Sequence, residues 1–245
     1  MSTTGFISDI HSNYEALRAT LEFFEKEKVD QIICAGDIIG YGAEPNECIE
    51  AVKGVSILTV FGNHEAAITG LYPMQHFASH AKEALEWNRD RINADNFEYI
   101  NDLKLEAVFD NRIKVVHSSP VIPQEFPYLM TDGEYAEALV KSAEKICIIG
   151  HTHMPAVFYY DAPRYHFGEI VTDTFVIEKD YKYIINIGSV GQPRDGNRRS
   201  CCGIFDSQTN VFKIRRVEYD FMAARKKILM AGLPTFLAER LMYGT

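Results

Sequence analysis

The stretch that decides the fold is residues 7–13, which have the sequence ISDIHSN. The apolar segment 5–7 predicts the end of a short buried strand, after which a carboxylate and an imidazole follow two positions apart. Side chains two residues apart on an extended segment point the same way, so Asp9 and His11 are predicted to bind one cation together. The alternative is that Asp9 only caps a helix beginning near Tyr14.

Strands and helices alternate after this stretch. We predict strands over residues 5–8, 31–35 and 56–61, and helices over residues 14–28 and 45–53. Strands separated by helices pair in parallel through right-handed crossovers. In such sheets the active site lies at the carboxyl ends of the strands. The residues that follow each strand are therefore the first place to look for function.

Five segments place metal-binding side chains directly after an apolar run. They contribute Asp9, His11, Asp37, Asn63, His64, His117, His151 and His153. Taken singly, each has a structural alternative, because a histidine after a strand is commonly a hydrogen-bonded residue, and Gly36-Asp37 or Gly62-Asn63 can be simple turns. Those alternatives do not explain why the same kind of side chain recurs at five strand ends. We predict that the set converges on a metal centre.

The residue types suit a pair of divalent ions. Two such ions about 3.5–4 Å apart repel each other unless an anion lies between them. Asp37 stands alone after its strand and is predicted to be this catalytic bridge. The set contains histidines and an amide but no cysteine, which suits two open-site ions, Mn²⁺ first, with Fe, Zn²⁺, Co²⁺ or Ni²⁺ as alternatives. Such a pair activates water, and His64 beside Asn63 is predicted to protonate the leaving group.

The remaining chain predicts a helical insert and a second group of strands. The insert spans about residues 70–103 as a lid or wall over the site, with four predicted buried residues, Ala78, Ala81, Leu85 and Trp87. Further strands are expected over residues 106–109, 112–116, 145–149, 156–160, 171–178, 182–187, 202–206 and 210–219. Helices are expected over residues 132–143 and, as a pair broken at 232–234, over residues 220–245. No repeat or linker is visible, so residues 1–245 are predicted to form a single domain.

Composition excludes several classes of protein. The net charge of −9 disfavours binding to long nucleic acids or to membrane surfaces, because no basic surplus meets their phosphates. The N-terminus does not resemble a signal peptide, and no apolar run approaches the roughly 18 residues that span a membrane. The five cysteines follow no zinc-ligand spacing, and three lie in apolar runs. We predict a reduced, cytoplasmic protein; the oligomeric state is left open.

The order and spacing of the polar segments resemble those of the calcineurin-like metallophosphoesterases. The matching motifs are Asp9-Ile-His11, Gly36-Asp37, Gly62-Asn63-His64-Glu65, His117 and Gly150-His151-Thr152-His153, within a resemblance that spans about residues 4–200. Residues 186–196, NIGSVGQPRDG, also resemble the segment that closes the site in bacterial and archaeal members. The resemblance implies an α+β (α/β) fold, a four-layer αββα sandwich of two mixed sheets flanked by helices. It also implies one ion held by Asp9, His11, Asp37 and His153, a second held by Asp37, Asn63, His117 and His151, and His64 as general acid.

Three positions depart from the family pattern. Ser12 and Ser118 stand where glycine is usual, and both changes are small enough for the metals still to bind. The run Gly36-Asp37-Ile-Ile-Gly40 lacks the Asp-Arg pair of the serine/threonine protein phosphatases, which use that arginine on phosphate. We predict that Arg194 takes the place of this arginine and binds the substrate together with Asn63 and His64. The alternative is that Arg194 is a surface arginine in a turn.

The resemblance implies a metal-dependent phosphoric ester hydrolase, a phosphodiesterase or phosphatase in which a metal-activated water attacks. Small nucleotide-type substrates, such as diadenosine tetraphosphate, are predicted. The insert aromatics either stack a nucleobase or form the core of the insert; they are Tyr72, Phe77, Trp87 and Tyr99. The alternatives are a serine/threonine protein phosphatase and a non-catalytic scaffold of the same fold.

Overall fold

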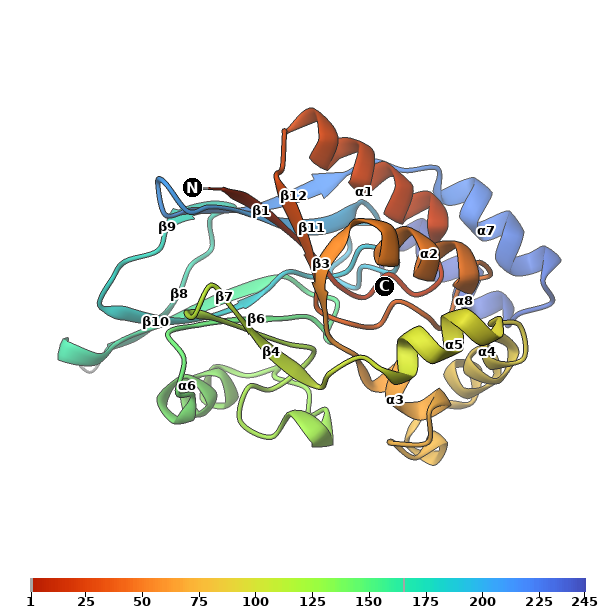
Figure 1. The fold of residues 1–245 in the computed structure, drawn as a ribbon, viewed down its shortest axis with the longest axis horizontal. Coiled ribbons are helices and arrows are strands. Elements are labelled where there is room, and N and C mark those ends of the chain that lie inside the picture. The colour runs from red at the N-terminus through yellow and green to blue at the C-terminus, as the bar shows by residue number, and fades with distance from the viewer. Residues whose placement is uncertain (1, 165) are drawn as a thin grey trace.

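The computed structural model describes residues 2–164 and 166–245, and its strands form two sheets stacked face to face (Figure 1). Sheet I runs in the order β3 (Ser56–Thr59), β2 (Gln31–Cys34), β1 (Thr3–Ile7), β11 (Ser200–Asp206), β12 (Val211–Val217) and β9 (Thr174–Val176). Sheet II runs in the order β4 (Glu106–Phe109), β5 (Ile113–Val116), β6 (Ile146–Ile149), β10 (Tyr181–Asn186), β7 (Ala156–Asp161) and β8 (His166–Glu169).

Both sheets are mixed, as predicted. In sheet I, β1, β2 and β3 are parallel neighbours, whereas β11, β12 and β9 join through antiparallel pairs. In sheet II, β5, β6 and β10 are parallel, and β4, β7 and β8 are antiparallel additions. The parallel strands of each sheet therefore deliver their carboxyl ends, and the loops that follow, to a common edge.

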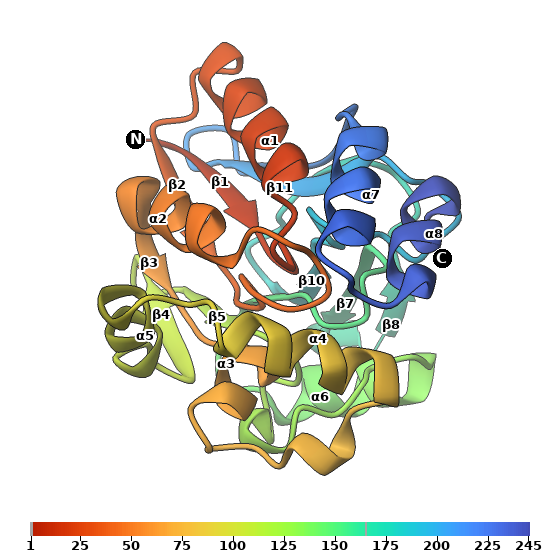
Figure 2. The same ribbon diagram turned by 90° about the vertical axis from the view of Figure 1, so that its right-hand side faces the viewer.

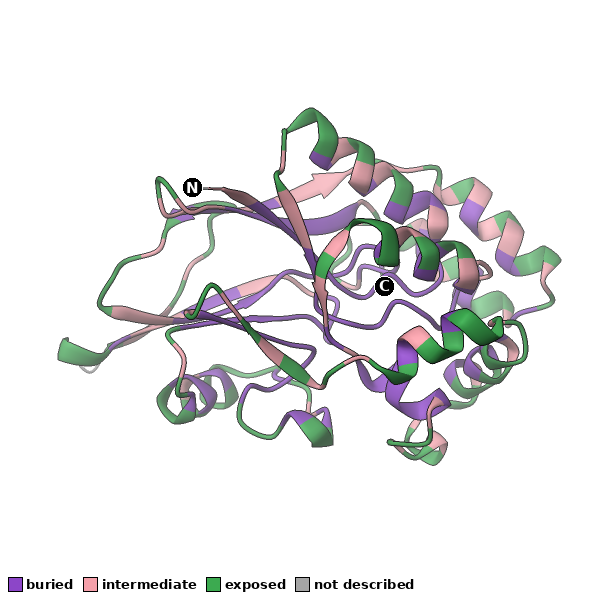
Figure 3. Cartoon of the chain, viewed as in Figure 1, coloured by how far each residue is buried: buried purple, intermediate pink, exposed green. Residues whose placement is uncertain are grey.

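Side-chain alternation along the strands produces the layers. In β1, Phe6 packs in the core between the sheets, whereas Ile7 packs in the core beneath helices α1 (Tyr14–Lys26) and α2 (Pro45–Val55). On the far side, α6 (Asp132–Lys141) packs against β7 and β10 of sheet II. Burial follows the same order, with buried strands between helices whose outer faces are exposed (Figure 3). The predicted four-layer αββα arrangement is confirmed.

The helical insert differs from its prediction in detail. Helix α3 (Asn63–Ile68) starts inside the strand-end motif, where the sequence predicted no helix, and α4 (Ser79–Arg89) and α5 (Ala94–Asn101) follow. Ala81 and Leu85 are buried as predicted. The prediction for Ala78 is wrong, because this residue precedes the first turn of α4 and is exposed. Trp87, near the C-terminal end of α4, is only half-buried.

The C-terminal region contains the two predicted helices, α7 (Phe221–Met230) and α8 (Thr235–Tyr243). The sequence analysis did not predict strand β8, which comes between β7 and β9 in the chain and lies next to β7 at the edge of sheet II. All five cysteines are buried and free. None of the helices in residues 2–164 and 166–245 combines the length and apolarity needed to cross a membrane. The single-domain layout over residues 1–245 stays a prediction.

Candidate metal centre

The candidate ligands lie in loops that directly follow parallel strands of both sheets. Figure 2 looks toward this end of the sheets, with α4 and α8 beside the loops. Asp9 and His11 follow β1, Asp37 follows β2, Asn63 and His64 begin α3 after β3, His117 follows β5, and His151 and His153 follow β6. All eight side chains are buried. The structure brings the aspartates and histidines of the set together, and Asn63 precedes His64 at the start of α3.

Asp9 and His11 meet for a different reason from the one predicted. Neither is extended: their φ angles are 52° and 51°, in the left-handed region. The loop is held there because the backbone N–H groups of Ile10 and His11 both donate to the Asp37 carbonyl, at 2.8 and 3.0 Å. The capping alternative for Asp9 is wrong, since Asn13 accepts the Ala16 N–H at the start of α1.

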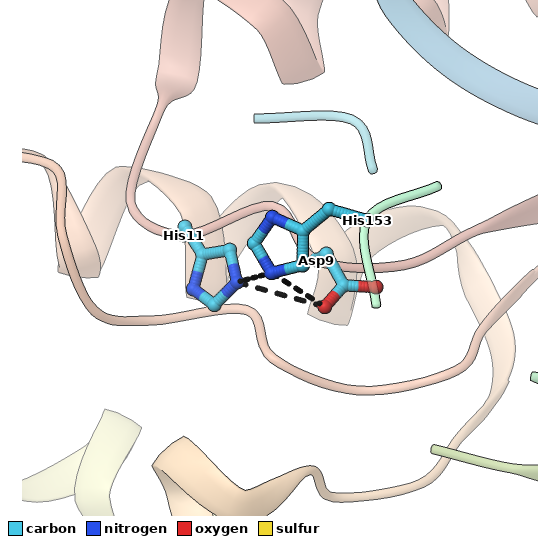
Figure 4. A group of neighbouring side chains, drawn as sticks. All are labelled: Asp9, His11 and His153. Carbon is cyan, nitrogen blue, oxygen red and sulfur yellow. Dashed lines mark hydrogen bonds and ion pairs between the residues drawn. The ribbon is translucent and has the colours of Figure 1, made fainter. Parts of the chain in front are cut away.

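The first cluster contains Asp9, His11 and His153 (Figure 4). His153 Nε2 lies 3.0 Å from His11 Nε2 and 3.2 Å from Asp9 Oδ1. The opposite ring nitrogens donate to backbone carbonyls, His11 Nδ1 to Ile39 at 3.0 Å and His153 Nδ1 to Gln192 at 2.5 Å. Because a carbonyl only accepts, each Nδ1 carries the proton and each Nε2 lone pair faces Asp9.

The second cluster contains Asp37, His117 and His151. His117 Nε2 lies 3.2 Å from Asp37 Oδ2 and 3.1 Å from His151 Nδ1. His117 Nδ1 donates to the Ala35 carbonyl at 2.9 Å, which again leaves Nε2 for the centre. Asp37 Oδ2 is also 3.6 Å from His11 Nε2, so this carboxylate lies between the two clusters.

His64 adds a third group of possible ligands that the sequence did not predict. Its Nε2 lies 3.8 Å from Asp37 Oδ2, and ligand atoms of His11, Asp37 and His64 all fall within 4.8 Å of one another. The His64 ring packs on Gly40, where a Cβ would collide with the imidazole. The φ of +100° at this residue also favours glycine. The geometry thus permits His64 either to bind an ion or to act beside one.

The charges of the centre are arranged around its two carboxylates. Burial opposes the ionisation of Asp9 and Asp37, yet the neighbouring histidines hold the pKa of each carboxyl below its usual value. Burial also disfavours the charged imidazole, but the two carboxylates raise the pKa of His117 to about 10. For His151 and His153 burial prevails and lowers the pKa to about 3. Two buried anions beside the neutral rings of His151 and His153 form a field that favours cations.

Unpaired polar atoms show that the residues fit metal ions. Asp9 Oδ1, Asn63 Oδ1 and His151 Nε2 are buried and make no hydrogen bond within the part of the chain that the structure describes. Buried polar groups without partners are rare in folded proteins, because each costs about 1–3 kcal/mol. All three atoms are of types that bind divalent ions, and all three belong to the predicted ligand sets.

Glu65 is a positioning residue that the sequence motif contained without revealing its role. Its carboxylate accepts the backbone N–H groups of Asp37 and Gly62 at 2.9 and 2.8 Å, and that of Ile39 at 3.1 Å. It thereby joins the loop carrying Asp37 to the start of α3. The signal was present in retrospect, because Glu65 is the third residue of α3, where a capping carboxylate belongs.

Asn88 of α4 is a second positioning residue, and no sequence motif marks it. Its Oδ1 accepts the Ser12 hydroxyl at 2.6 Å and the Gly40 N–H at 3.0 Å, while its amide donates to the Gly42 carbonyl at 3.1 Å. The helical insert is therefore bonded to two of the ligand loops. The serine at position 12, unusual for the family resemblance, supplies one of these bonds.

A cavity of about 200 Å³ opens onto the centre. Its lining includes Asn63 and His151, together with Tyr41, Tyr72, His76, Phe77, Ala78, His80, Ala81, Phe126, Tyr128, Arg194 and Arg240. Of the four predicted aromatics, Tyr72 and Phe77 line this cavity. Trp87 instead stacks with Arg91 and donates to the Ala231 carbonyl, and Tyr99 packs against the core beneath α1 and α2.

Arg194 lies in the cavity wall rather than on an exposed turn. Its Nη2 donates to the Tyr41 hydroxyl and to Gln192 Oε1, both at 3.2 Å. Phe126, Tyr128 and Arg240 were not predicted, because the segment before α6 and the C-terminal helix carry no recognisable motif. A larger cavity of about 410 Å³, lined by residues such as Arg112 and Lys145, contains none of the predicted site residues.

Two facing mixed sheets with buried His/Asp clusters at their strand ends define a metallophosphoesterase fold. The family model of the calcineurin-like phosphoesterase superfamily domain matches residues 3–210, and the chain belongs to this superfamily. It is 38% identical over 248 residues to an uncharacterized protein of Methanocaldococcus jannaschii, covering 99% of this chain and 98% of that protein.

Two further relatives extend this finding. The crystal structure of a metallophosphoesterase from Sphaerobacter thermophilus matches with a TM-score of 0.84 and 32% identity, covering 100% of this chain and 99% of that chain. A shorter match, 36% identical over 66 residues, covers 26% of this chain and 24% of the symmetrical bis(5'-nucleosyl)-tetraphosphatase of Actinobacillus succinogenes. The family implies a phosphoester substrate, and the buried His/Asp groups are consistent with a dinuclear metal site.

Proposed function

We propose that this protein uses two divalent metal ions, Mn²⁺ first, to hydrolyse phosphoester or phosphoanhydride bonds of small nucleotide-type molecules. The observation that carries the proposal is the convergence of two buried carboxylates and five histidines at the strand ends, with unpaired ligand atoms among them. The match to the metallophosphoesterase family supports the reaction class. The aromatic lining of the cavity and the short match to a nucleosyl-tetraphosphatase support the substrate class.

The residues would divide between two ions, and Asp37 is available to both. One ion would be held by Asp9, His11, Asp37 and His153, and the other by Asp37, Asn63, His117 and His151. When bound, such a pair polarises phosphoryl oxygens and lowers the pKa of water at the site. Asp37 suits the shared position because its Oδ2 lies within 3.6 Å of ring nitrogens from both clusters, His117 Nε2 and His11 Nε2.

The chain itself binds the substrate and supplies the proton. In hydrolysis the water oxygen bonds to phosphorus, and the bond to the leaving oxygen breaks with its electron pair. His64 Nε2, on the Asp37 side of its ring, would carry the proton for that oxygen. Burial lowers the pKa of His64 well below its usual value, and an anionic phosphate beside it would raise the pKa again. Arg194 would bind the reacting phosphate, with Asn63 facing the same cavity.

Elemental analysis and a substrate screen test the proposal. The purified protein should hold two divalent ions per chain, and with added Mn²⁺ it should hydrolyse dinucleoside polyphosphates or nucleotides faster than a phosphoserine peptide. Protein stripped with a chelator is the control, and re-addition of metal should restore the activity. Faster hydrolysis of the phosphopeptide would favour a protein phosphatase. Absence of bound metal and of all activity would support the scaffold alternative.

A further inference from the structure

Two arginines from distant parts of the chain line the same cavity. Arg194 lies in the closing segment, residues 186–196, at the end of β10, whereas Arg240 lies on α8, outside residues 3–210 that match the family. Arg240 Nε donates to the Thr245 carbonyl, and its guanidinium stacks over Phe236 at 5.2 Å. The hydrogen bonds of the two guanidiniums within the described residues go to Tyr41, Gln192 and Thr245, none of which is an aspartate or glutamate. The C-terminal helix thus adds a second cation to the site.

The cavity lacks the negative charge that would neutralise these arginines. The chain has 34 acidic residues, yet the lining contains two arginines, three histidines and no carboxylate. Burial, and then repulsion from the charge of Arg194, lower the pKa of Arg240 to about 10. Two guanidiniums sharing one partly enclosed space whose lining contains no aspartate or glutamate favour an anionic ligand that reaches both.

We propose that Arg240 binds a second phosphoryl group of the substrate, next to the one held at the metal centre and Arg194. This inference rests on the proposed function and narrows its substrate class to nucleoside polyphosphates that react at a phosphoanhydride bond. The aromatic part of the cavity, Tyr72, Phe126 and Tyr128, would contact the base of the same molecule. Tyr128 is half exposed, and its ring stacks on that of His151 with centroids 4.1 Å apart, which places this aromatic surface beside the metal centre.

The reaction at such a substrate balances without any further reactant. The oxygen of water bonds to the phosphorus at the metal centre, and the anhydride bond between that phosphorus and the bridging oxygen breaks. The bridging oxygen leaves with the electron pair as part of the second phosphate, whose negative charge Arg240 holds. His64 would supply the proton of the leaving oxygen, as in the proposed function, and the water protons pass to His64, to solvent and to the phosphate product.

Binding of phosphonates tests the role of Arg240 without requiring turnover. Titration calorimetry on the Mn²⁺-loaded protein compares methylenediphosphonate, which has two phosphonate groups, with methylphosphonate, which has one. Arg240→Gln should weaken methylenediphosphonate about tenfold or more, because it loses a charge-assisted hydrogen bond, and leave methylphosphonate within about twofold. Arg194→Gln should weaken both ligands, since it acts on the first group.

Two further variants separate this role from a structural one. Arg240→Lys keeps the positive charge and should retain most of the preference for methylenediphosphonate. Arg89→Gln makes the same chemical change on the exposed face of α4, outside the cavity, and should alter neither affinity. Metal chelation by the free ligand is identical for every variant and cancels in the comparison. Melting temperatures report whether α8 stays folded when Arg240 loses its contacts to Thr245 and Phe236.

The outcomes distinguish this inference from the proposed function. Equal weakening of both phosphonates by Arg240→Gln, no weakening of either, or failure of the wild type to prefer methylenediphosphonate would overturn the role of Arg240. If the wild type then hydrolysed phosphoesters, the proposed function would stand alone. Selective binding through Arg240 in a protein that hydrolysed no phosphoester would contradict the proposed function and leave the two-phosphate site intact.

Discussion

The floor of the site and its rim are built by different parts of the chain. The floor consists of the strand-end loops that carry Asp9, His11, Asp37, Asn63, His64, His117, His151 and His153, and the rim consists of Tyr72, His76, Phe126, Tyr128 and Arg240. Floor residues are all buried, whereas the rim ranges from Phe126, which is 6% exposed, to Tyr128, which is 50% exposed. Under the proposed function, the reaction chemistry would depend on residues at the strand ends of both sheets, and the choice of substrate on the helices and the connecting segment around them.

The hydrogen bonds of the two regions differ in the same way. Floor loops bond to one another through backbone groups: Val190 and Gly191 donate to the carbonyls of Ser8 and Asp9, both at 2.9 Å. The C-terminal helices, which carry the rim residue Arg240, attach through side chains, as where Lys227 of α7 pairs with Glu15 and Glu44, and through the backbone bond from Gly196 to the Gly244 carbonyl at 2.8 Å. Changes in the floor should therefore abolish function, and changes in the rim or its attachment should tune it.

Asp37→Asn should have the largest effect. It removes the charge shared by both ion positions, so we expect both ions to be lost, with affinity falling by at least the 10–100-fold typical of changes outside the ligand shell. Elemental analysis after gel filtration measures this loss, and turnover should disappear with the metal. Asp102→Asn, an exposed change at the end of α5, is the control. A variant with full metal occupancy would contradict the bridging role.

His64→Ala should come next in size and should keep the metals. Loss of a general acid costs about 10²–10⁴-fold in turnover, and the loss should be greatest for alkyl esters, whose leaving oxygen needs the proton most. The ratio of rates for p-nitrophenyl and alkyl phosphates measures this dependence, and His166→Ala on exposed β8 is the matched control. Equal slowing of both esters would contradict the role of His64 as general acid. Loss of metal would indicate that His64 binds an ion.

Glu44→Gln should have the smallest effect, on stability and not on the floor. Burial beside Glu15 raises the pKa of Glu44 from 4.5 to about 7, even though Lys227 opposes the rise. The folded protein therefore keeps this proton to a higher pH than the unfolded chain, and the contribution of Glu44 to stability declines as pH rises from about 4.5 to 7. The variant should gain free energy of unfolding relative to the wild type between pH 5 and pH 7.

Urea unfolding at both pH values measures this difference, with Glu50→Gln on the exposed face of α2 as the control. A difference that does not change with pH would show that Glu44 titrates as it does in the unfolded chain. Turnover with saturating metal should change little, because Glu44 touches no floor residue of the ligand sets. A large loss of turnover would mean that the attachment of α7 also sets the geometry of the floor.

Much of the fold and floor could be predicted because their signals are local. Alternation in β1 and β6 places successive residues in different cores, and ligand-type residues directly follow apolar runs. The conformation of Asp9 and His11 could not be predicted, because it is held by hydrogen bonds that Ile10 and His11 donate to the carbonyl of Asp37, in a loop nearly thirty residues away. The bonds of Asn88 were equally hidden, since nothing near it in the chain marks it as a partner of Ser12 and Gly40.

The sequence by itself determined the two mixed sheets, the metallophosphoesterase family and the candidate metal-binding side chains. It could do so because strand periodicity, strand ends and metal-binding side chains are properties of neighbouring residues. Only the tertiary structure decided which ring nitrogens face the carboxylates, that α3 begins inside a ligand motif, and that Arg240 reaches the cavity opened by Asn63 and His151. The physical reason is that these contacts depend on packing between elements far apart in the chain, which no local pattern encodes.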